Sequence, residues 1–125
     1  MPFLKEEISM IRHIVLARFP TALAPVEVDK VFAALHELKD KIPGILSVMA
    51  GANNSPEPLA RGYTHAFTVD FADAASRDAY LPHPDHLKVA GAWSRRPKAG
   101  SRAYWCLIMR CRVSAMNMRM AVILI

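Results

Sequence analysis

In two segments of this 125-residue chain, successive side chains follow the alternating pattern of a β-strand. Both segments carry apolar side chains on each of their two faces. One face of each segment holds apolar residues and one histidine: Ile11, His13, Val15, Ala17 and Phe19 in residues 11–19, and His65, Phe67, Val69 and Phe71 in residues 63–71. The opposite face carries Ile14, Leu16 and Ala66. Because successive strand side chains point to opposite faces, these segments require a sheet that is covered on both sides.

The remaining predicted elements are, in chain order, a helix in residues 25–42, a strand in residues 45–49, a loop in residues 51–62, helices in residues 73–81 and 84–92, and a last strand in residues 103–109. This βαββαβ order predicts an α+β, ferredoxin-like fold, in which an antiparallel sheet carries its helices on one face. A second copy packed sheet against sheet would cover the other face. We therefore expect a homodimeric α/β barrel.

The positive net charge of +5 is confined to one end of the chain. Residues 93–125 hold seven of the 16 lysines and arginines and none of the 11 acidic residues, which leaves the first 92 residues with a net charge of −2. A nucleic-acid-binding domain would carry its positive charge on the folded surface. We therefore expect no nucleic-acid partner.

The chain start and the cysteines bear on location. No apolar run reaches the ~18 residues that a membrane-spanning helix needs, and the first ten residues, with two glutamates, do not form a secretory signal. We expect an N-terminal extension in residues 1–9, a domain in residues 10–110 and no membrane partner. Cys106 and Cys111 have neither zinc-finger nor redox-motif spacing, so free thiols in a reducing cytoplasm are expected.

Four motifs occur in order: MIRHIVL at residues 10–16, LKDKIPG at 38–44, GYTH at 62–65 and YLPHPDH at 80–86. Over residues 10–92 they make the chain resemble the stress-responsive A/B barrel domain (Dabb) family. The resemblance implies a ferredoxin-like monomer and a homodimeric α/β barrel. Most members have no established biochemical role. A polyketide cyclase in the family runs an intramolecular aldol condensation between sheet and helices, and its functional positions correspond to His13, His65, Tyr80 and His86.

These four residues are the candidate catalytic group. Imidazole titrates near neutral pH and can move protons in carbonyl chemistry, so His86 could act as a base while Tyr80 donates a hydrogen bond to an enolate. His13 and His65 share a strand face and could hold substrate or water in one pocket. In the structural alternative, both histidines are buried and hydrogen-bonded, and Tyr80 and His86 close the fold.

The cluster formed by His83, Pro84, Asp85 and His86 also has a metal-binding interpretation. Two histidines one helical turn apart can hold zinc when a third ligand is present. Proline and an acidic residue are, however, ordinary at the start of a helix. We expect that structural use, and neither a metal nor a cofactor.

Residues 93–125 depart from the family pattern, whose last strand ends in a sequence such as VLVFDYE. In the reading frame that starts one base earlier, the codons of residues 93–111 permit LVPAPEGGLEGVLVFDYEV, with a stop codon possible directly afterwards. One hypothesis is a single-base frameshift in this tail. The alternative is a divergent tail whose residues 103–109 still pair as the last strand, while the apolar stretch in residues 116–125 would be sticky if exposed.

The sequence leaves open whether the protein is an enzyme. One hypothesis is a stress-associated binding or structural homodimer with a small histidine-lined pocket. Another is a lyase or cyclase acting on a polyketide-like carbonyl compound, and a third is a cofactor-free monooxygenase. Beyond its own second copy, the expected partner is a small apolar or aromatic carbonyl ligand. An open cavity of at least a few hundred Å³ that reaches His65, Tyr80 and His86 would favour a ligand binder or an enzyme. A pocket closed by Phe67, Val69 and helix side chains would favour the structural role.

Overall fold

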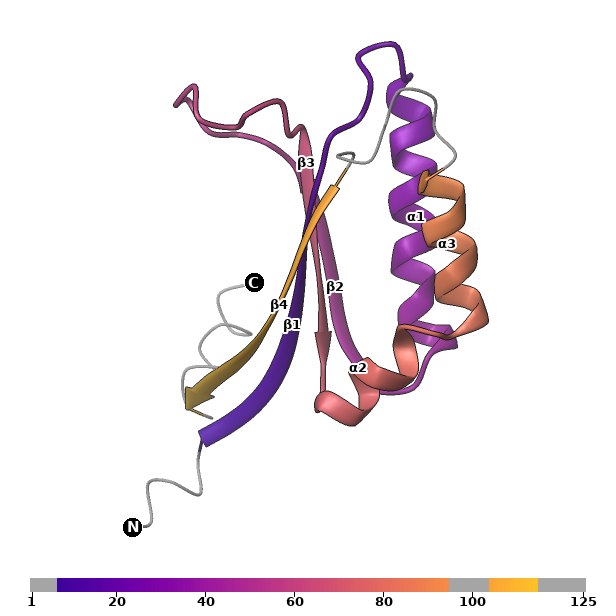
Figure 1. Ribbon diagram of the computed structural model, residues 1–125, viewed down its shortest axis with the longest axis vertical. Helices are drawn as coiled ribbons and strands as arrows, with labels where there is room; N and C mark the ends of the chain where they lie inside the picture. Colours follow the sequence, from indigo (N-terminus) through magenta and orange to yellow (C-terminus); the bar gives the residue numbers. More distant parts are fainter. Residues whose placement is uncertain (1–6, 95–103, 115–125) are drawn as a thin grey trace.

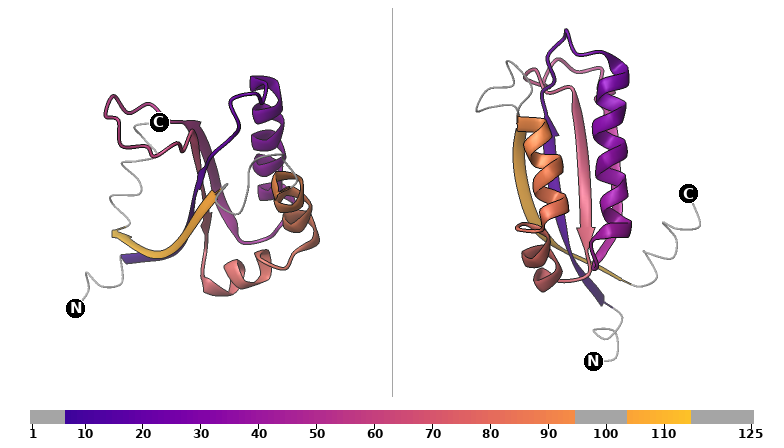
Figure 2. Two further views of the ribbon diagram at one scale, coloured as in Figure 1. Left: turned by 45° about the horizontal axis from the view of Figure 1, so that its top comes forward. Right: turned by 90° about the vertical axis from the view of Figure 1, so that its right-hand side faces the viewer.

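The computed structural model describes residues 7–94 and 104–114. They form a four-stranded antiparallel sheet of order β2-β3-β1-β4, and the helices pack against one of its faces (Figure 1; Figure 2). The elements are β1 (Glu7–Ala17), α1 (Pro25–Lys41), β2 (Ile45–Ala52), β3 (His65–Phe71), α2 (Ala74–Tyr80), α3 (Pro84–Ser94) and β4 (Tyr104–Ser114). The predicted ferredoxin-like fold is confirmed, and so is the split of the second helical region into two helices.

The strand boundaries differ from the prediction because cross-strand pairing, and not local pattern, decides where a strand ends. β1 begins at Glu7, earlier than residue 11, because Ser114 at the far end of β4 pairs with it. β2 continues to Ala52 because Ala52 pairs with His65 at the start of β3. The last strand, expected in residues 103–109, is β4, and all of β4 from Tyr104 to Ser114 pairs with β1. Residues 1–6, 95–103 and 115–125, including the apolar stretch in residues 116–125, lie outside the described residues.

Local signals in the sequence account for the helix boundaries. Helix α1 begins at Pro25, whose missing N–H and restricted φ suit the first helical position. Gly44 follows the helix with a φ of +93°, a conformation that costs little energy only for glycine. Helix α2 is capped by Asp73, whose carboxylate accepts a hydrogen bond from the Ser76 N–H at 2.8 Å. Among the described residues, no helix is long and apolar enough to cross a membrane.

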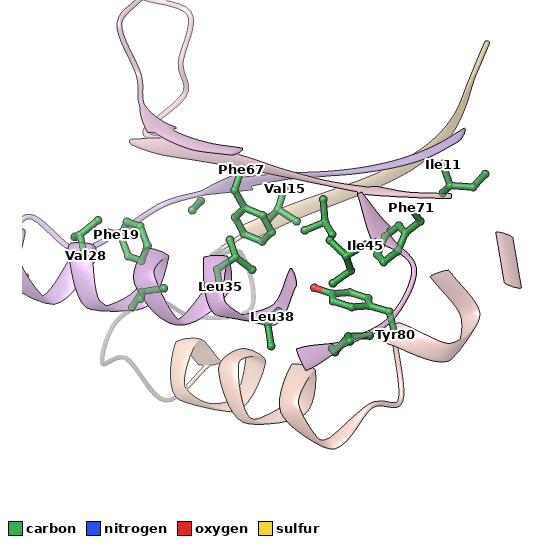
Figure 3. Close-up of a cluster of buried hydrophobic side chains, with 14 residues drawn as sticks. Ile11, Val15, Phe19, Val28, Leu35, Leu38, Ile45, Phe67, Phe71 and Tyr80 are labelled. Carbon is green, nitrogen blue, oxygen red and sulfur yellow. The ribbon is translucent and has the colours of Figure 1, made fainter. Parts of the chain in front are cut away.

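The hydrophobic core lies between the helices and the face of the sheet that they cover, here called the inner face (Figure 3). Its largest fully buried side chains are Tyr80, Phe71, Leu35, Leu38, Ile42 and Val69. Phe71 of β3 and Tyr80 of α2 meet edge to face, with ring centroids 4.9 Å apart. This contact fixes α2 against the sheet and places Tyr80 beneath β1.

The opposite, outer face of the sheet carries apolar side chains without helices over them. One row of paired residues crosses all four strands: Met49, Thr68, Ile14 and Leu107. Met49 and Leu107 are 62% and 63% exposed. Leu16 and Met109 extend this apolar surface and are 38% and 41% exposed. The alternation predicted for β1 and β3 is therefore confirmed on both faces of the sheet.

Candidate functional site

A cavity of about 220 Å³ opens between the inner face of the sheet and the helices. Most of its wall is apolar, with Val15, Leu35, Phe67, Leu81, Val89 and Ala90. Its polar lining consists of His13 from β1, Tyr80 from α2, His86 from α3 and Cys106 from β4. Three of the four predicted site residues therefore lie around one space, together with a cysteine.

His13 lies deep in this wall and is only 5% exposed. Its Nε2 contacts Cys106 Sγ. Its Nδ1 is buried and has no hydrogen-bond partner among the described residues. Burial, with a smaller contribution from His86, lowers the pKa of His13 to about 4, so the imidazole is neutral at pH 7.

Tyr80 ends helix α2 and is 1% exposed. Its ring packs against the rings of Phe71 and His86, with a centroid separation of 4.1 Å to His86. In Figure 3 its hydroxyl points away from the backbone of α2, into the layer between the sheet and the helices. Burial raises the pKa of Tyr80 well above its ordinary value, and Cys106 shifts it in the same direction. The phenol therefore keeps its proton and can donate a hydrogen bond to a ligand oxygen.

His86 lies in the first turn of α3, and its Nδ1–H donates a hydrogen bond to the Leu81 carbonyl at 2.9 Å. A carbonyl oxygen can only accept, so this bond fixes the tautomer that carries its proton on Nδ1 and leaves Nε2 free to accept one. Burial lowers the pKa of His86, the bond to Leu81 partly opposes that effect, and His83 lowers the pKa slightly further. A neutral His86 beside a protonated Tyr80 combines a proton acceptor with a hydrogen-bond donor.

His65 does not line this cavity, although it shares the inner face with His13 as predicted. His13 pairs with Val69 whereas His65 pairs with Ala17, and four residues of strand separate these positions by roughly 13 Å. His65 packs against Phe19 and Phe32, with ring centroids 5.1 and 5.5 Å away. Its Nδ1 lies 2.8 Å from Thr64 Oγ1. It lines a second hollow, of about 250 Å³, beside Phe19.

Cys106 is the cavity residue whose position the sequence did not reveal. The alternation of residues 103–109 places Cys106 on one face of a strand. Both faces of that segment are apolar, so the sequence does not show which face is turned to the core. The register of β4 decides the matter, because Cys106 pairs with Val15, an inner-face residue. Only this pairing brings the thiol to His13.

The two histidines of the His83–His86 cluster have separate structural roles. His83 Nδ1 accepts a hydrogen bond from the Asp85 N–H at 3.1 Å, at the start of α3. His86 donates through its own Nδ1 to Leu81. Within the described parts of the chain, no group of three histidine, cysteine or acidic side chains is arranged to hold a metal ion.

Known proteins share both the sequence pattern and the fold. The chain is 28% identical over 80 residues to the stress-response A/B barrel domain-containing protein HS1 of Arabidopsis thaliana, covering 64% of this chain and 73% of that protein. It is 23% identical over 77 residues to olivetolic acid cyclase of Cannabis sativa, covering 62% and 76%. A dimeric ferredoxin-like protein of unknown function from Jannaschia sp. superposes with a TM-score of 0.71 and 25% identity, covering 80% and 97%.

The family model for the stress responsive A/B barrel domain matches residues 11–99. The match begins within β1, two residues before His13, and includes the strand and helices that carry His65, Tyr80 and His86. It also runs past residue 92, where the resemblance was expected to end. Because the match spans most of its length, the chain belongs to the stress responsive A/B barrel domain family.

Proposed function

We propose that this protein is a homodimeric binding protein that takes a small apolar or aromatic carbonyl compound into the cavity lined by His13, Tyr80 and His86. The observation that carries this proposal is the composition of the cavity wall. The wall is largely apolar, as ligand sites usually are, and contains a few polar groups that can orient a ligand. The Tyr80 hydroxyl can donate to a carbonyl oxygen, and His86 Nε2 can accept from a hydroxyl or an acidic C–H.

The homodimer is supported by the outer face of the sheet. The row formed by Met49, Thr68, Ile14 and Leu107 crosses all four strands and has no helix over it. An exposed apolar surface of this kind marks an interaction site, and the same surface on a second copy is self-complementary around a two-fold axis. The similar protein from Jannaschia sp. is described as dimeric. Both cysteines are free thiols, which supports a reducing cytoplasm as the place where the dimer works.

Sedimentation velocity with matched leucine variants tests the dimer. We expect the wild-type protein to sediment as a dimer at micromolar concentration and Leu107→Lys to sediment as a monomer. Leu87→Lys is the control, because Leu87 is 54% exposed but lies on helix α3, away from the outer face. A folded wild-type protein that stays monomeric at every concentration would contradict the proposal.

Ligand binding is tested by isothermal titration with acetophenone and benzoylacetone. We expect His86→Ala and Tyr80→Phe each to weaken binding about fivefold, because each variant loses one hydrogen bond worth about 1 kcal/mol. His36→Ala is the control, since His36 is an exposed residue of α1 that does not line the cavity. Wild-type protein that binds neither compound, or equal weakening by His36→Ala, would argue against the cavity as the site.

A lyase or cyclase is the second candidate, and the fixed tautomer of His86 favours it. His86 Nε2 could remove a proton from the carbon next to a carbonyl, while the Tyr80 hydroxyl donates to the developing enolate oxygen. The similarity to olivetolic acid cyclase supports this chemistry. In this proposal His13 helps to shape the site, and His65 lies too far along the strands to contact the same ligand.

Proton exchange separates binding from catalysis. In D₂O, an enzyme of this kind would exchange the α-protons of benzoylacetone faster than buffer does, as followed by proton NMR. His86→Ala should remove the acceleration while the fold remains intact. Binding without accelerated exchange would leave the binding protein as the function. Nothing observed in the described residues favours the oxygenase hypothesis over these two.

A further inference from the structure

Cys106 brings to the cavity a nucleophilic sulfur that neither binding nor proton transfer by His86 uses. Its Sγ contacts His13 Nε2, and both residues line the same wall. We propose that Cys106 and His13 form a nucleophilic pair that adds covalently to small, apolar α,β-unsaturated carbonyl compounds entering the cavity. This goes beyond the proposed function because it requires a bond to the protein and needs no base at His86.

The position of the Cys106 thiol leaves it accessible from solvent and fixes it beside His13. β4 is one of the two edge strands of the described sheet, and Cys106 is exposed there as a residue. Its pairing with Val15 turns the sulfur to the inner face, towards His13. A compound can therefore reach the sulfur from solvent while its apolar part lies against Val15 and Phe67.

A second observation concerns His13, the residue that the thiol contacts. His13 is 5% exposed, and its Nδ1 has no hydrogen-bond partner among the described residues. Buried polar atoms in folded proteins nearly always have a partner, and leaving one without costs free energy. The unpaired nitrogen belongs to the same ring that lines the cavity and contacts the thiol through Nε2, so a chemical use of this ring would account for it.

The lining selects the class of ligand. The wall is largely apolar, which favours a hydrocarbon skeleton over a charged compound. The Tyr80 hydroxyl lies in the same wall and keeps its proton, so it can donate to a carbonyl oxygen. A compound with a carbonyl conjugated to a carbon–carbon double bond satisfies both groups, because the soft sulfur attacks the β-carbon while the oxygen receives the hydrogen bond.

The reaction balances without any co-reactant. Burial lowers the pKa of His13 to about 4, and partial burial of the Cys106 sulfur raises the pKa of its thiol, so the resting pair is a thiol and a neutral imidazole. As sulfur bonds to the β-carbon, the π electrons move to the carbonyl oxygen as an enolate and the thiol proton passes to His13 Nε2. His13 then returns this proton to the α-carbon. The product is a thioether adduct in which the former carbon–carbon double bond is saturated. No group leaves, and no oxidant or reductant is needed.

The test incubates the full chain with 2-cyclohexen-1-one and follows the adduct by intact mass and peptide mapping. Cys111 is an internal control, because it pairs with Met10 and does not line the cavity. We expect labelling at Cys106 that saturates with enone concentration, is lost in Cys106→Ser and persists in Cys111→Ser. Iodoacetamide, which needs no carbonyl recognition, should discriminate much less between the two cysteines.

Two variants test the chemistry. His13→Gln should slow labelling by about 10²-fold, the low end of what a positioned base contributes. Because His13 is buried and its replacement can disturb folding, Tyr80→Phe provides a second test that keeps the packing, with an expected slowing of about fivefold for the lost hydrogen bond. Equal labelling of both cysteines, a rate that never saturates, or an unchanged rate in folded Tyr80→Phe would overturn the proposal.

Discussion

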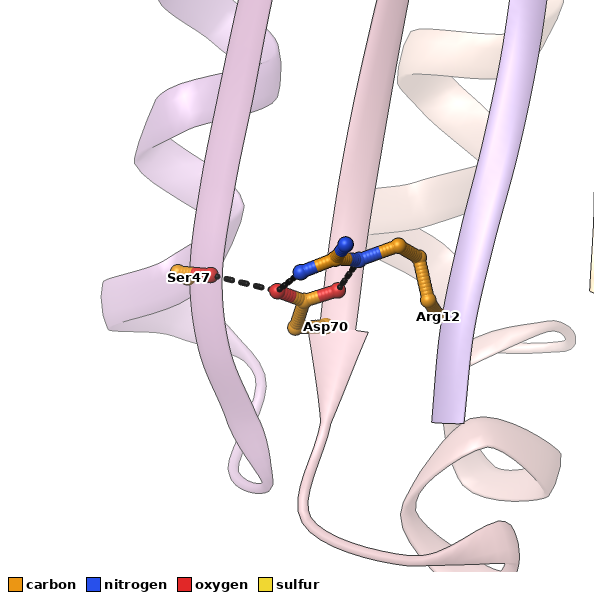
Figure 4. A network of polar contacts seen from close by, with 3 residues as sticks. All are labelled: Arg12, Ser47 and Asp70. Atoms are coloured by element: carbon orange, nitrogen blue, oxygen red, sulfur yellow. Dashed lines mark hydrogen bonds and ion pairs between the residues drawn. The ribbon is translucent and has the colours of Figure 1, made fainter. Parts of the chain in front are cut away.

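Arg12 and Asp70 form a two-point ion pair across β1 and β3, with Arg12 Nε 2.8 Å from Asp70 Oδ1 and Nη2 3.0 Å from Oδ2 (Figure 4). Ser47 of β2 donates its hydroxyl to the same carboxylate at 3.0 Å. Asp70 is only 5% exposed although it lies on the outer face. These bonds join three neighbouring strands at one level of the sheet, so one carboxylate fixes their register.

Breaking this pair from one side should destabilise the protein more than removing both partners. Arg12→Met leaves a nearly buried carboxylate without its cation, and we expect a loss of roughly 3 kcal/mol, the low end for a broken buried pair because Arg12 is partly exposed. Arg12→Met combined with Asp70→Leu should lose less than the sum of the single variants. Urea unfolding at one fixed protein concentration measures the cycle, because the proposed dimer would make stability depend on concentration.

Ser47→Ala measures how much stability is lost when Asp70 loses one neutral hydrogen bond and keeps its ion pair. It removes one hydroxyl donor and leaves the ion pair intact, so we expect a cost of about 1 kcal/mol. If Ser47→Ala were as damaging as Arg12→Met, the charge of Arg12 would not be what stabilises Asp70.

Gly44 and Gly51 should respond in opposite ways to alanine. Gly44 has a φ of +93°, and an added Cβ would meet the Ser76 side chain. Gly44→Ala should therefore lower the free energy of unfolding by about 1–2 kcal/mol from backbone strain alone, with the clash adding to it. Gly51 lies in β2 with no atom within 4 Å of an added Cβ, so Gly51→Ala should leave stability unchanged or slightly increased. Thermal melts of both variants make the comparison, and equal effects would refute the account of the turn after α1.

Acid should destabilise the fold through His13. The pKa of His13 falls from an ordinary value of 6.5 to about 4 in the folded protein, so the unfolded chain binds more protons in that interval. The stability that depends on neutral His13 is complete above pH 6.5 and is lost as the pH falls towards 4, up to about 3 kcal/mol. The lowered pKa of His86 acts in the same direction.

Urea unfolding at pH 7.5, 6 and 5 follows this effect. A folded His13→Gln variant has no titrating group at that position, so its stability should decline less steeply between pH 6.5 and pH 5 than that of the wild type. Parallel pH profiles would show that other groups cause the acid sensitivity.

The frameshift hypothesis for residues 93–125 is decided by the coding DNA of independent isolates. The frameshift hypothesis predicts a one-base difference that restores an ending such as VLVFDYE, whereas the proposal for Cys106 requires the present reading frame. In the shifted frame, valine is required immediately after Trp105, so the same sequencing decides whether the thiol at residue 106 occurs in the natural gene. The same reading frame without interruption in every isolate would refute the frameshift and retain Cys106. The pairing of β4 with β1 shows that the present tail can supply the last strand.

Local patterns in the sequence were enough to assign the elements. The alternation around His13 and His65 identified the strands and their inner faces. Side-chain direction in a strand depends only on parity, that is, on whether a position is odd or even along the strand. Pro25, Gly44 and Asp73 marked helix boundaries, because each acts on the backbone within one turn of its own position. The apolar outer face also followed from parity, and with it the expectation of a second copy.

Tertiary structure alone decided which of these residues meet. Parity does not give strand register, so the sequence placed His13 and His65 on one face but did not show that they lie far apart along it. Register likewise joins Arg12 to Asp70 across 58 residues of chain and brings Cys106 to His13 across 93. Such contacts depend on packing between segments that are distant in sequence. Local sequence patterns do not determine which of those segments pack together or in which register.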